Sequence, residues 1–184
     1  MSLVVRIAAA LGIVAIVFNA LTTQNEKRPN LAEPSLVVRK YERLIELFDG
    51  EKLVKTYKMV LGFSPTGDKF TEGDGRTPEG EFYVFAKNPK SKFHLSLGLS
   101  YPGPEDAERG LKDGLISKEE HDEIVAAIAE KRMPLQKTRL GGEIYIHGGG
   151  TASDWTEGCV ALDNVEMAEL FKAVPIGTKV TILP

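Results

Sequence analysis

Residues 141–162 read GGEIYIHGGGTASDWTEGCVAL, and this stretch decides how the rest of the chain is interpreted. Its first part, residues 141–146, ends in β-branched and aromatic residues and predicts a short β-strand that delivers His147 at its end. A glycine-rich excursion follows and ends at Cys159, the single cysteine of the chain. Because such an excursion can fold back on the strand, we expect the imidazole and the thiol to lie close together.

This combination has the parts of a cysteine enzyme, which needs a thiolate, a base for its proton, and backbone N–H groups directed at the oxyanion. His147 and Cys159 supply the first two. Gly158 permits a tight turn, which predicts that the N–H groups of Gly158 and Cys159 form the oxyanion site. A lone cysteine followed by apolar residues is more often a small buried side chain, and this alternative stays open on the cysteine alone. The histidine, the glycine turn and an export segment together favour a nucleophile.

The chain before this stretch has the pattern of strands and turns. Two apolar or alternating runs, residues 44–48 and 53–61, flank Asp49 and Gly50, which is typical of a hairpin. Further predicted strands are residues 36–38, 81–86 and 180–183, and a glycine-rich loop is predicted over residues 62–80.

Residues 105–132 depart from this pattern and predict a helical insertion. Apolar residues recur there at helical spacing between charges, and Ser117 with Glu120 has the pattern of a capping box. Residues 164–173 are amphipathic and predict one C-terminal helix, which Asn164 is expected to cap through its side chain. The predicted fold class is therefore mostly β, with a helical insertion and one C-terminal helix.

The N-terminal part of the chain differs from the rest. Residues 7–18 are an unbroken run of apolar residues and glycine after Arg6, which predicts a signal peptide or membrane anchor over residues 1–21. A buried core helix is the alternative. The polar residues 22–34 predict a tether to a single domain at residues 35–184.

The composition excludes several classes of protein. Apolar residues make up 42% and charged residues 27% of the chain, as in soluble globular proteins. The net charge is -3 with both signs scattered, so no basic stripe exists for nucleic acid. The three histidines lack the spacing of zinc ligands, and we expect neither a metal nor an organic cofactor. Residues 147–150 also resemble the oxyanion loop of esterases, but no Gly-x-Ser-x-Gly motif accompanies them.

Several motifs together resemble the L,D-transpeptidase (YkuD-type) catalytic domain. They are His147-Gly148, WTEGCVAL at residues 155–162, GDK at 67–69, EGDGRTPEGEF at 72–82, YP at 101–102 and TRLGG at 138–142. The resemblance covers roughly residues 35–184. It implies a β-rich catalytic domain that acts on peptidoglycan stem peptides, in which the cysteine attacks the carbonyl of the third stem residue and an amine or water resolves the thioester.

The resemblance also assigns roles to residues. It implies that Cys159 is the nucleophile, that His147 is the general base and later acid, and that the carbonyl of Gly148 holds the imidazole tautomer. Two positions depart from the family pattern, because Glu157 and Ala161 stand where a histidine and an arginine are usual. These departures leave hydrolysis, including release of a lipoprotein from the wall, as an alternative to transpeptidation. A non-catalytic wall-binding module is a second alternative.

The expected substrate contacts lie around this motif. They are Tyr101, Trp155, Thr156, Glu157 and Arg76, with core packing as an equal alternative for Tyr101 and Trp155. The expected partners are stem peptides and, as a further candidate, a wall-linked lipoprotein. We expect the protein to be exported to the periplasmic or cell-wall side, with residues 3–21 as its only contact with the membrane.

Overall fold

The structure is a computed structural model that describes residues 31–184 of the 184-residue chain. The predicted signal or anchor segment at residues 1–21 and most of the predicted tether lie outside the described residues. Among residues 31–184, no helix is both long enough and apolar enough to cross a membrane. The first strand starts at Pro34, and Leu31 packs against the core.

An eight-stranded sheet forms the body of the domain, in the order β3-β2-β1-β8-β4-β5-β6-β7. The β1–β8 and β6–β7 pairs are parallel, and the other neighbouring pairs are antiparallel. The prediction of a mostly β fold is therefore confirmed. The strands are β1 (Pro34–Arg39), β2 (Leu44–Asp49), β3 (Lys52–Lys58), β4 (Gly80–Ser91), β5 (His94–Leu99), β6 (Tyr145–His147), β7 (Val160–Ala161) and β8 (Lys179–Leu183).

Alternation of side chains explains why the first strands form. In β1 and β2, every second residue points to the core, and Leu36, Val38 and Ile45 are fully buried. Gly50 follows β2 with φ 60°, which suits the turn into β3. Helix α3 (Asn164–Ala173) adds buried side chains to the same core, including Met167. Burial of this apolar surface provides the main driving force for folding.

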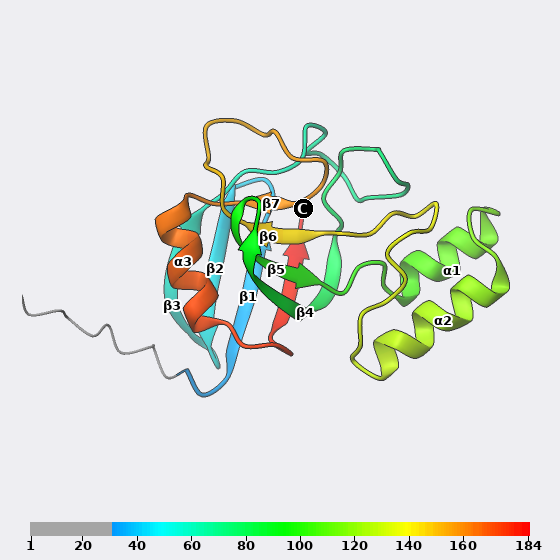
Figure 1. Cartoon of the computed structure of the whole chain (residues 1–184), viewed down its shortest axis with the longest axis horizontal. Coiled ribbons are helices and arrows are strands. Elements are labelled where there is room, and N and C mark those ends of the chain that lie inside the picture. Colours follow the sequence, from blue (N-terminus) through cyan, green and yellow to red (C-terminus); the bar gives the residue numbers. More distant parts are fainter. Residues whose placement is uncertain (1–30) are drawn as a thin grey trace, which may run out of the picture.

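The sheet is curled, so that its two ends meet. Val60, which follows β3, and Ala161 in β7 exchange two backbone hydrogen bonds of 2.9 Å. Gly62 forms a further bridge with Thr156. In Figure 1 the loop after β3 and the excursion before β7 lie along the same side of the molecule. The curl therefore brings the glycine-rich loop of residues 62–80 next to the segment that carries Cys159.

Helices α1 (Pro104–Lys112) and α2 (Lys118–Ala129) form the predicted insertion and lie side by side at one end of the molecule (Figure 1). The Ser117 hydroxyl accepts the N–H of Glu120, and the Glu120 carboxylate accepts the N–H of Ser117, which confirms the capping box. The pair has a small apolar core of its own, formed by Ala107, Ile116, Ile124 and Leu140.

The C-terminal helix has the predicted bounds, but its predicted cap is wrong. Asp163 is the residue at the N-cap, and Asn164 is the first residue of α3. The Asn164 side chain instead accepts the N–H of Gly149 at 2.9 Å. It therefore ties the excursion after β6 to the start of α3.

Three further strands differ from the prediction. The sequence pattern did not predict β5 or β7, and β6 covers only Tyr145–His147 in place of residues 141–146. Gly141 has φ 88° and Glu143 has φ 53°, and neither angle is compatible with an extended strand. The segment before β6 is therefore a loop and not a strand, and it contributes directly to the site described below.

Candidate active site

His147 is a buried base candidate at the end of β6, and its side chain is 3% exposed. Its Nδ1 lies 2.5 Å from the carbonyl oxygen of Gly148, so Nδ1 carries the proton that it donates and Nε2 is left as an acceptor. Phe93 stacks on the imidazole with ring centroids 4.6 Å apart, and Trp155 meets it edge-on at 5.6 Å. These contacts fix both the tautomer and the plane of the ring.

The pKa of His147 is lowered, and burial is the main cause. The charge of Lys92, on the turn between β4 and β5, lowers it further, whereas the hydrogen bond to Gly148 opposes the shift. The imidazole is therefore neutral at pH 7 and able to accept a proton at Nε2.

Cys159 directly precedes β7, which pairs with the strand that ends at His147. The parallel pairing of β6 and β7 sets Ile146 beside Val160, which places Cys159 beside Tyr145. Its Sγ accepts the backbone N–H of Tyr145 at 3.4 Å and donates to the carbonyl oxygen of Glu143 at 3.4 Å. The excursion therefore folds back on the strand that ends at the histidine.

The sulfur carries its proton in the resting protein. Burial raises the pKa of the Cys159 thiol to about 11, and the carboxylates of Glu143 and Glu157 add to this effect. The N–H of Tyr145 and the charge of Lys69 oppose it. Because both the thiol and the imidazole are neutral, a mechanism that uses this pair requires the base to take the proton as the sulfur attacks.

The turn before Cys159 has a shape that only glycine fits. Gly158 has φ 124°, and a Cβ there would meet the carbonyl oxygen of Arg76 at 2.6 Å. Its N–H donates to the Thr156 hydroxyl at 3.2 Å, which corrects the prediction that this N–H faces an oxyanion. The Thr156 hydroxyl in turn donates to the carbonyl of Cys159 at 2.7 Å. The N–H of Cys159 remains the candidate oxyanion donor.

Two of the predicted substrate contacts are interior residues. Tyr101 is fully buried, and its hydroxyl donates to the carbonyl of Leu140 at 2.9 Å, so the core alternative holds for this residue. Thr156 is 3% exposed and shapes the turn at Gly158. Neither side chain presents a surface to a peptide.

The other predicted contacts are accessible. Trp155 is 37% exposed, its Nε1 donates to the carbonyl of Gly150 at 3.2 Å, and it lines an open pocket of about 260 Å³ with Gly149, Gly150 and Ala152. Glu157 is exposed beside the nucleophile candidate. Arg76 is half-buried and lies over the Phe70 ring at 5.9 Å, along the glycine-rich loop.

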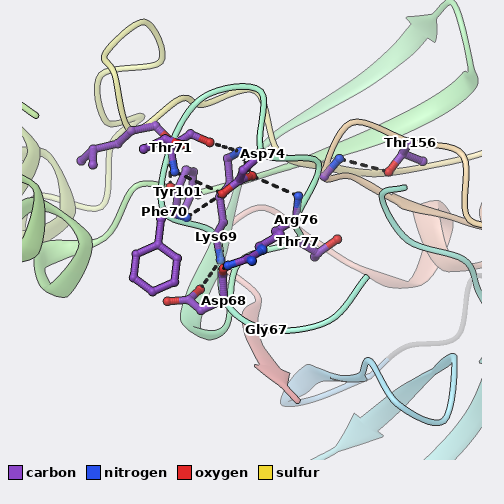
Figure 2. Close-up of polar contacts among 12 residues, drawn as sticks. Gly67, Asp68, Lys69, Phe70, Thr71, Asp74, Arg76, Thr77, Tyr101 and Thr156 are labelled. Atoms are coloured by element: carbon purple, nitrogen blue, oxygen red, sulfur yellow. Dashed lines mark hydrogen bonds and ion pairs between the residues drawn. The ribbon is translucent and has the colours of Figure 1, made fainter. Parts of the chain in front are cut away.

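A polar network holds the glycine-rich loop under the turn at Gly158. Asp74 accepts the N–H groups of Phe70, Thr71 and Arg76 at 2.8, 3.2 and 3.0 Å, and the Nζ of Lys69 at 2.9 Å. Figure 2 shows Asp74 at the centre of this network, between Lys69 and Arg76. Burial alone would raise the pKa of Asp74, but these hydrogen bonds outweigh it and lower the pKa. Asp74 is therefore a charged anchor of the loop.

Sequence patterns did not predict the roles of several residues around the site. Phe93 lies on the turn of a hairpin whose second strand was not predicted, and Glu143 lies in a segment that was predicted to be a strand. Asp154 accepts the N–H of Leu61 at 2.8 Å and pairs with Arg43 at 2.8 Å, which fastens the excursion to the chain after β3. Among residues 31–184, no group of three or more histidine, cysteine, aspartate or glutamate side chains is arranged to hold a metal ion.

Comparisons with known proteins identify the family of this domain. Residues 33–182 match the L,D-transpeptidase catalytic domain, YkuD. The structure is similar to the helical cell shape determining protein Pgp2 from Campylobacter jejuni, with 21% identity over 82% of this chain and 47% of that chain and a TM-score of 0.56. Bd1075 from Bdellovibrio bacteriovorus is similar at 20% identity over 83% and 48%, with a TM-score of 0.54. The Ldtfm-avibactam carbamoyl enzyme is similar at 15% identity over 83% and 49%, with a TM-score of 0.51.

The similarity to these solved structures supports only a limited conclusion. The chain spans about half the length of the three solved structures, and at such identities they show the fold alone. No curated protein matches the sequence. The family match, in contrast, covers residues 33–182, which include every residue of the site described above. This chain belongs to the L,D-transpeptidase catalytic domain family.

Proposed function

We propose that the protein is a cysteine-dependent L,D-transpeptidase that transfers acyl groups of peptidoglycan stem peptides through a thioester on Cys159. The pairing of β6 with β7 carries this proposal, because it sets Cys159, the residue before β7, beside Tyr145 on the strand that ends at His147. The Gly148 carbonyl holds the imidazole with Nε2 unprotonated. Transfer of the thiol proton to Nε2 makes the sulfur nucleophilic at the moment of attack.

The steps follow from these positions. Sγ of Cys159 attacks the carbonyl carbon of the third stem residue, and its proton passes to Nε2 of His147. The tetrahedral oxyanion is stabilised by the N–H of Cys159. Collapse breaks the amide bond, and the leaving amine of the terminal D-alanine takes the proton from Nε2. An amine on a neighbouring stem then attacks the thioester, and the thiol is regenerated as the crosslink forms.

Hydrolysis of the same thioester is the alternative, favoured by one feature. Glu157 places an exposed carboxylate beside the nucleophile, where the family pattern has a histidine. A carboxylate there is able to hold a water molecule, and water would then resolve the thioester in place of an amine. Ala161, at the usual arginine position, is fully buried in β7 and offers no charge to an acceptor.

Incubation of the protein with a defined stem tetrapeptide, with and without an amine acceptor, tests the proposal. Mass spectrometry is expected to show exchange of the terminal D-alanine for the acceptor and a transient acyl adduct on Cys159. The Cys159→Ala variant is expected to fold normally and to lose turnover by at least about 10³-fold. Undiminished product from this variant would refute the role of the cysteine. Release of D-alanine without exchange would favour the hydrolase.

A covalent probe separates the enzyme from a non-catalytic wall-binding module. Avibactam forms a carbamoyl enzyme with the structurally similar Ldtfm protein. We expect one avibactam adduct on Cys159 in the wild-type protein and none in Cys159→Ala. A protein that binds stem peptides but forms neither a thioester nor this adduct is a binding module.

The cellular setting is part of the same proposal. We propose that residues 1–21 export the protein to the periplasmic or cell-wall side, with residues 3–21 as an anchor if the segment is retained. A wall-linked lipoprotein is a candidate acyl donor besides the stem peptides. Fractionation of cells that express the full chain, with mass spectrometry of its N-terminus, distinguishes a cleaved signal from an anchor.

A further inference from the structure

One side chain connects the helical insertion with the thiol. Gln136 follows α2, and its Oε1 accepts the backbone N–H of Glu143 at 2.8 Å. Its Nε2 donates to the carbonyl oxygens of Tyr101 and Pro134 at 3.0 and 2.9 Å. All the polar atoms of the Gln136 amide thus bind backbone, and they join the end of the insertion to the segment before β6.

The segment that Gln136 holds is the one that contacts Cys159. Glu143 has φ 53°, a conformation that a residue with a side chain adopts only when its surroundings enforce it. Its carbonyl oxygen accepts the thiol of Cys159 at 3.4 Å. Gly142 has no room for a Cβ, which would lie 2.4 Å from the carbonyl oxygen of Gln136. The two segments therefore touch backbone to backbone at this point.

We propose that Gln136 is a positioning residue, which holds the N–H of Glu143 so that the carbonyl of Glu143 stays on the Cys159 thiol and sets the direction of its proton. Only the expected effect of Gln136 on turnover rests on the proposed function. The mechanism is local, because the N–H and the carbonyl of Glu143 are separated only by its own φ and ψ angles, and fixing the N–H at φ 53° restricts where the carbonyl can point. A single side chain, that of Gln136, thereby links the helical insertion to the residue that contacts Cys159.

The proposal makes a distinct statement about the pH dependence of the sulfur. A hydrogen bond from the thiol to a carbonyl stabilises the protonated form, so its loss favours the thiolate. The charged groups that act on the sulfur are the carboxylates of Glu143 and Glu157 and the ammonium of Lys69. Gln136 carries no charge, and its replacement by an uncharged side chain of similar length leaves this set unaltered. A shift in the thiol titration then reports the hydrogen bond.

Alkylation of Cys159 by iodoacetamide as a function of pH, in the full chain, measures this titration. In Gln136→Met we expect the midpoint to fall by about one pH unit, which raises the alkylation rate near pH 8 about tenfold. With a stem tetrapeptide, kcat is expected to fall about tenfold while KM changes less than about twofold, because the thiol loses its fixed direction. Lys137→Ala changes the exposed neighbouring side chain and is the matched control, with both readouts at wild-type values.

The outcomes separate this inference from the proposed function. An unshifted alkylation midpoint in folded Gln136→Met overturns the role of Gln136, whatever the activity. A shifted midpoint in a protein that does not turn over stem peptides supports the role and refutes the proposed function. If Gln136→Met does not fold, hydrogen exchange on the wild-type protein decides. The Glu143 amide is expected to be protected, and exchange at the rate of a free amide overturns the inference.

Discussion

The sheet and the loops that carry the site are held together by different means. In β1, β2 and β8, backbone ladders and alternating apolar side chains such as Leu36 and Val180 provide the structure. In the loops around Cys159, single polar side chains bind backbone groups instead, as Asp74, Asp154 and Gln136 do. Stability in the sheet is therefore spread over many small contributions, whereas the geometry of the site depends on a few atoms.

Because of this difference, substitutions in the sheet and in the loops are expected to affect different properties. A truncated core side chain in the sheet lowers the free energy of unfolding without a specific effect on the thiol. A changed polar side chain in the loops alters what the nucleophile or the base contacts, even if the sheet is intact.

The largest effect is expected for His147→Asn. This change removes Nε2, the proton acceptor, from the end of a strand whose other contacts remain. Avibactam carbamoylation of Cys159 is expected to slow about 10³-fold, measured by time-resolved mass spectrometry. Leu36→Ala is the control in the sheet, and it is expected to lower the free energy of unfolding by about 3 kcal/mol while each folded molecule reacts at the wild-type rate. A rate in His147→Asn within tenfold of wild type would remove the base from the mechanism.

The next largest effect is expected for Asp74→Asn, which leaves the 2%-exposed Lys69 side chain without its ion pair. Because an uncompensated buried charge is costly, the free energy of unfolding is expected to fall by about 3 kcal/mol in urea titrations. The carbamoylation rate is expected to fall as well, since Arg76 in this loop packs on Gly158. Asp49→Asn makes the same chemical change in the sheet, where Asp49 accepts only an exposed N–H, and it is expected to cost less than about 1 kcal/mol. Equal costs for the two variants would contradict the comparison.

The difference between the sheet and the loops around Cys159 also separates the features that the sequence predicts from those that it does not. The hairpin at Asp49-Gly50 and the helix at residues 164–173 follow from alternation, helical periodicity and a turn signal, which are local properties. The predicted strand, the glycine-rich excursion and the single cysteine pointed to His147 and Cys159 as a pair, and the resemblance implied their roles. Sequence patterns did not predict that Glu143 would take a left-handed conformation. That conformation depends on the hydrogen bond from the Glu143 N–H to the Gln136 side chain, a contact that only the tertiary structure creates.

The same reason explains why local patterns did not settle the places of Lys69 and Tyr101. Lys69 stands in a glycine-rich loop, a pattern typical of an exposed charge, yet it is 2% exposed and bonded to Asp74. Tyr101 was expected with equal weight in a groove or in the core, and its hydroxyl has a buried partner in Leu140. Neither outcome is encoded locally, since burial depends on which segments the curled sheet brings together.

A smaller effect is expected for Phe93→Leu. The phenyl ring covers one face of His147, so its loss admits water and raises the pKa of the imidazole towards its ordinary value of 6.5. An NMR titration of His147 measures this change directly. Carbamoylation near pH 6 is expected to slow a few-fold, because more of the base is protonated. Phe70→Leu is the control, since Phe70 is exposed and stacks on Arg109 away from the imidazole. An unmoved His147 titration in Phe93→Leu would show that the ring does not desolvate the base.

The smallest effect is expected in the pH dependence of stability, where His147 and Asp74 act in different windows. Because the pKa of His147 is lowered in the folded state, unfolding takes up a proton below pH 6.5, and stability falls as the pH drops through this region. The slope from one such group is at most about 1.4 kcal/mol per pH unit. The pKa of Asp74 is also lowered, from 3.8, so its contribution is complete above that value and is lost only in stronger acid.

Urea titrations between pH 3 and 8 on the wild type, His147→Asn and Asp74→Asn resolve the two windows. The difference between the wild type and His147→Asn is expected to change as the pH falls below about 6.5, and the difference for Asp74→Asn only below about pH 4. In both pH ranges the change in the free energy of unfolding comes from the loops and from His147, because the sheet buries apolar residues whose hydration does not depend on pH. If the His147→Asn difference stayed constant as the pH fell below 6.5, the imidazole would titrate equally in the folded and unfolded states. Its burial would then not account for a neutral base at pH 7.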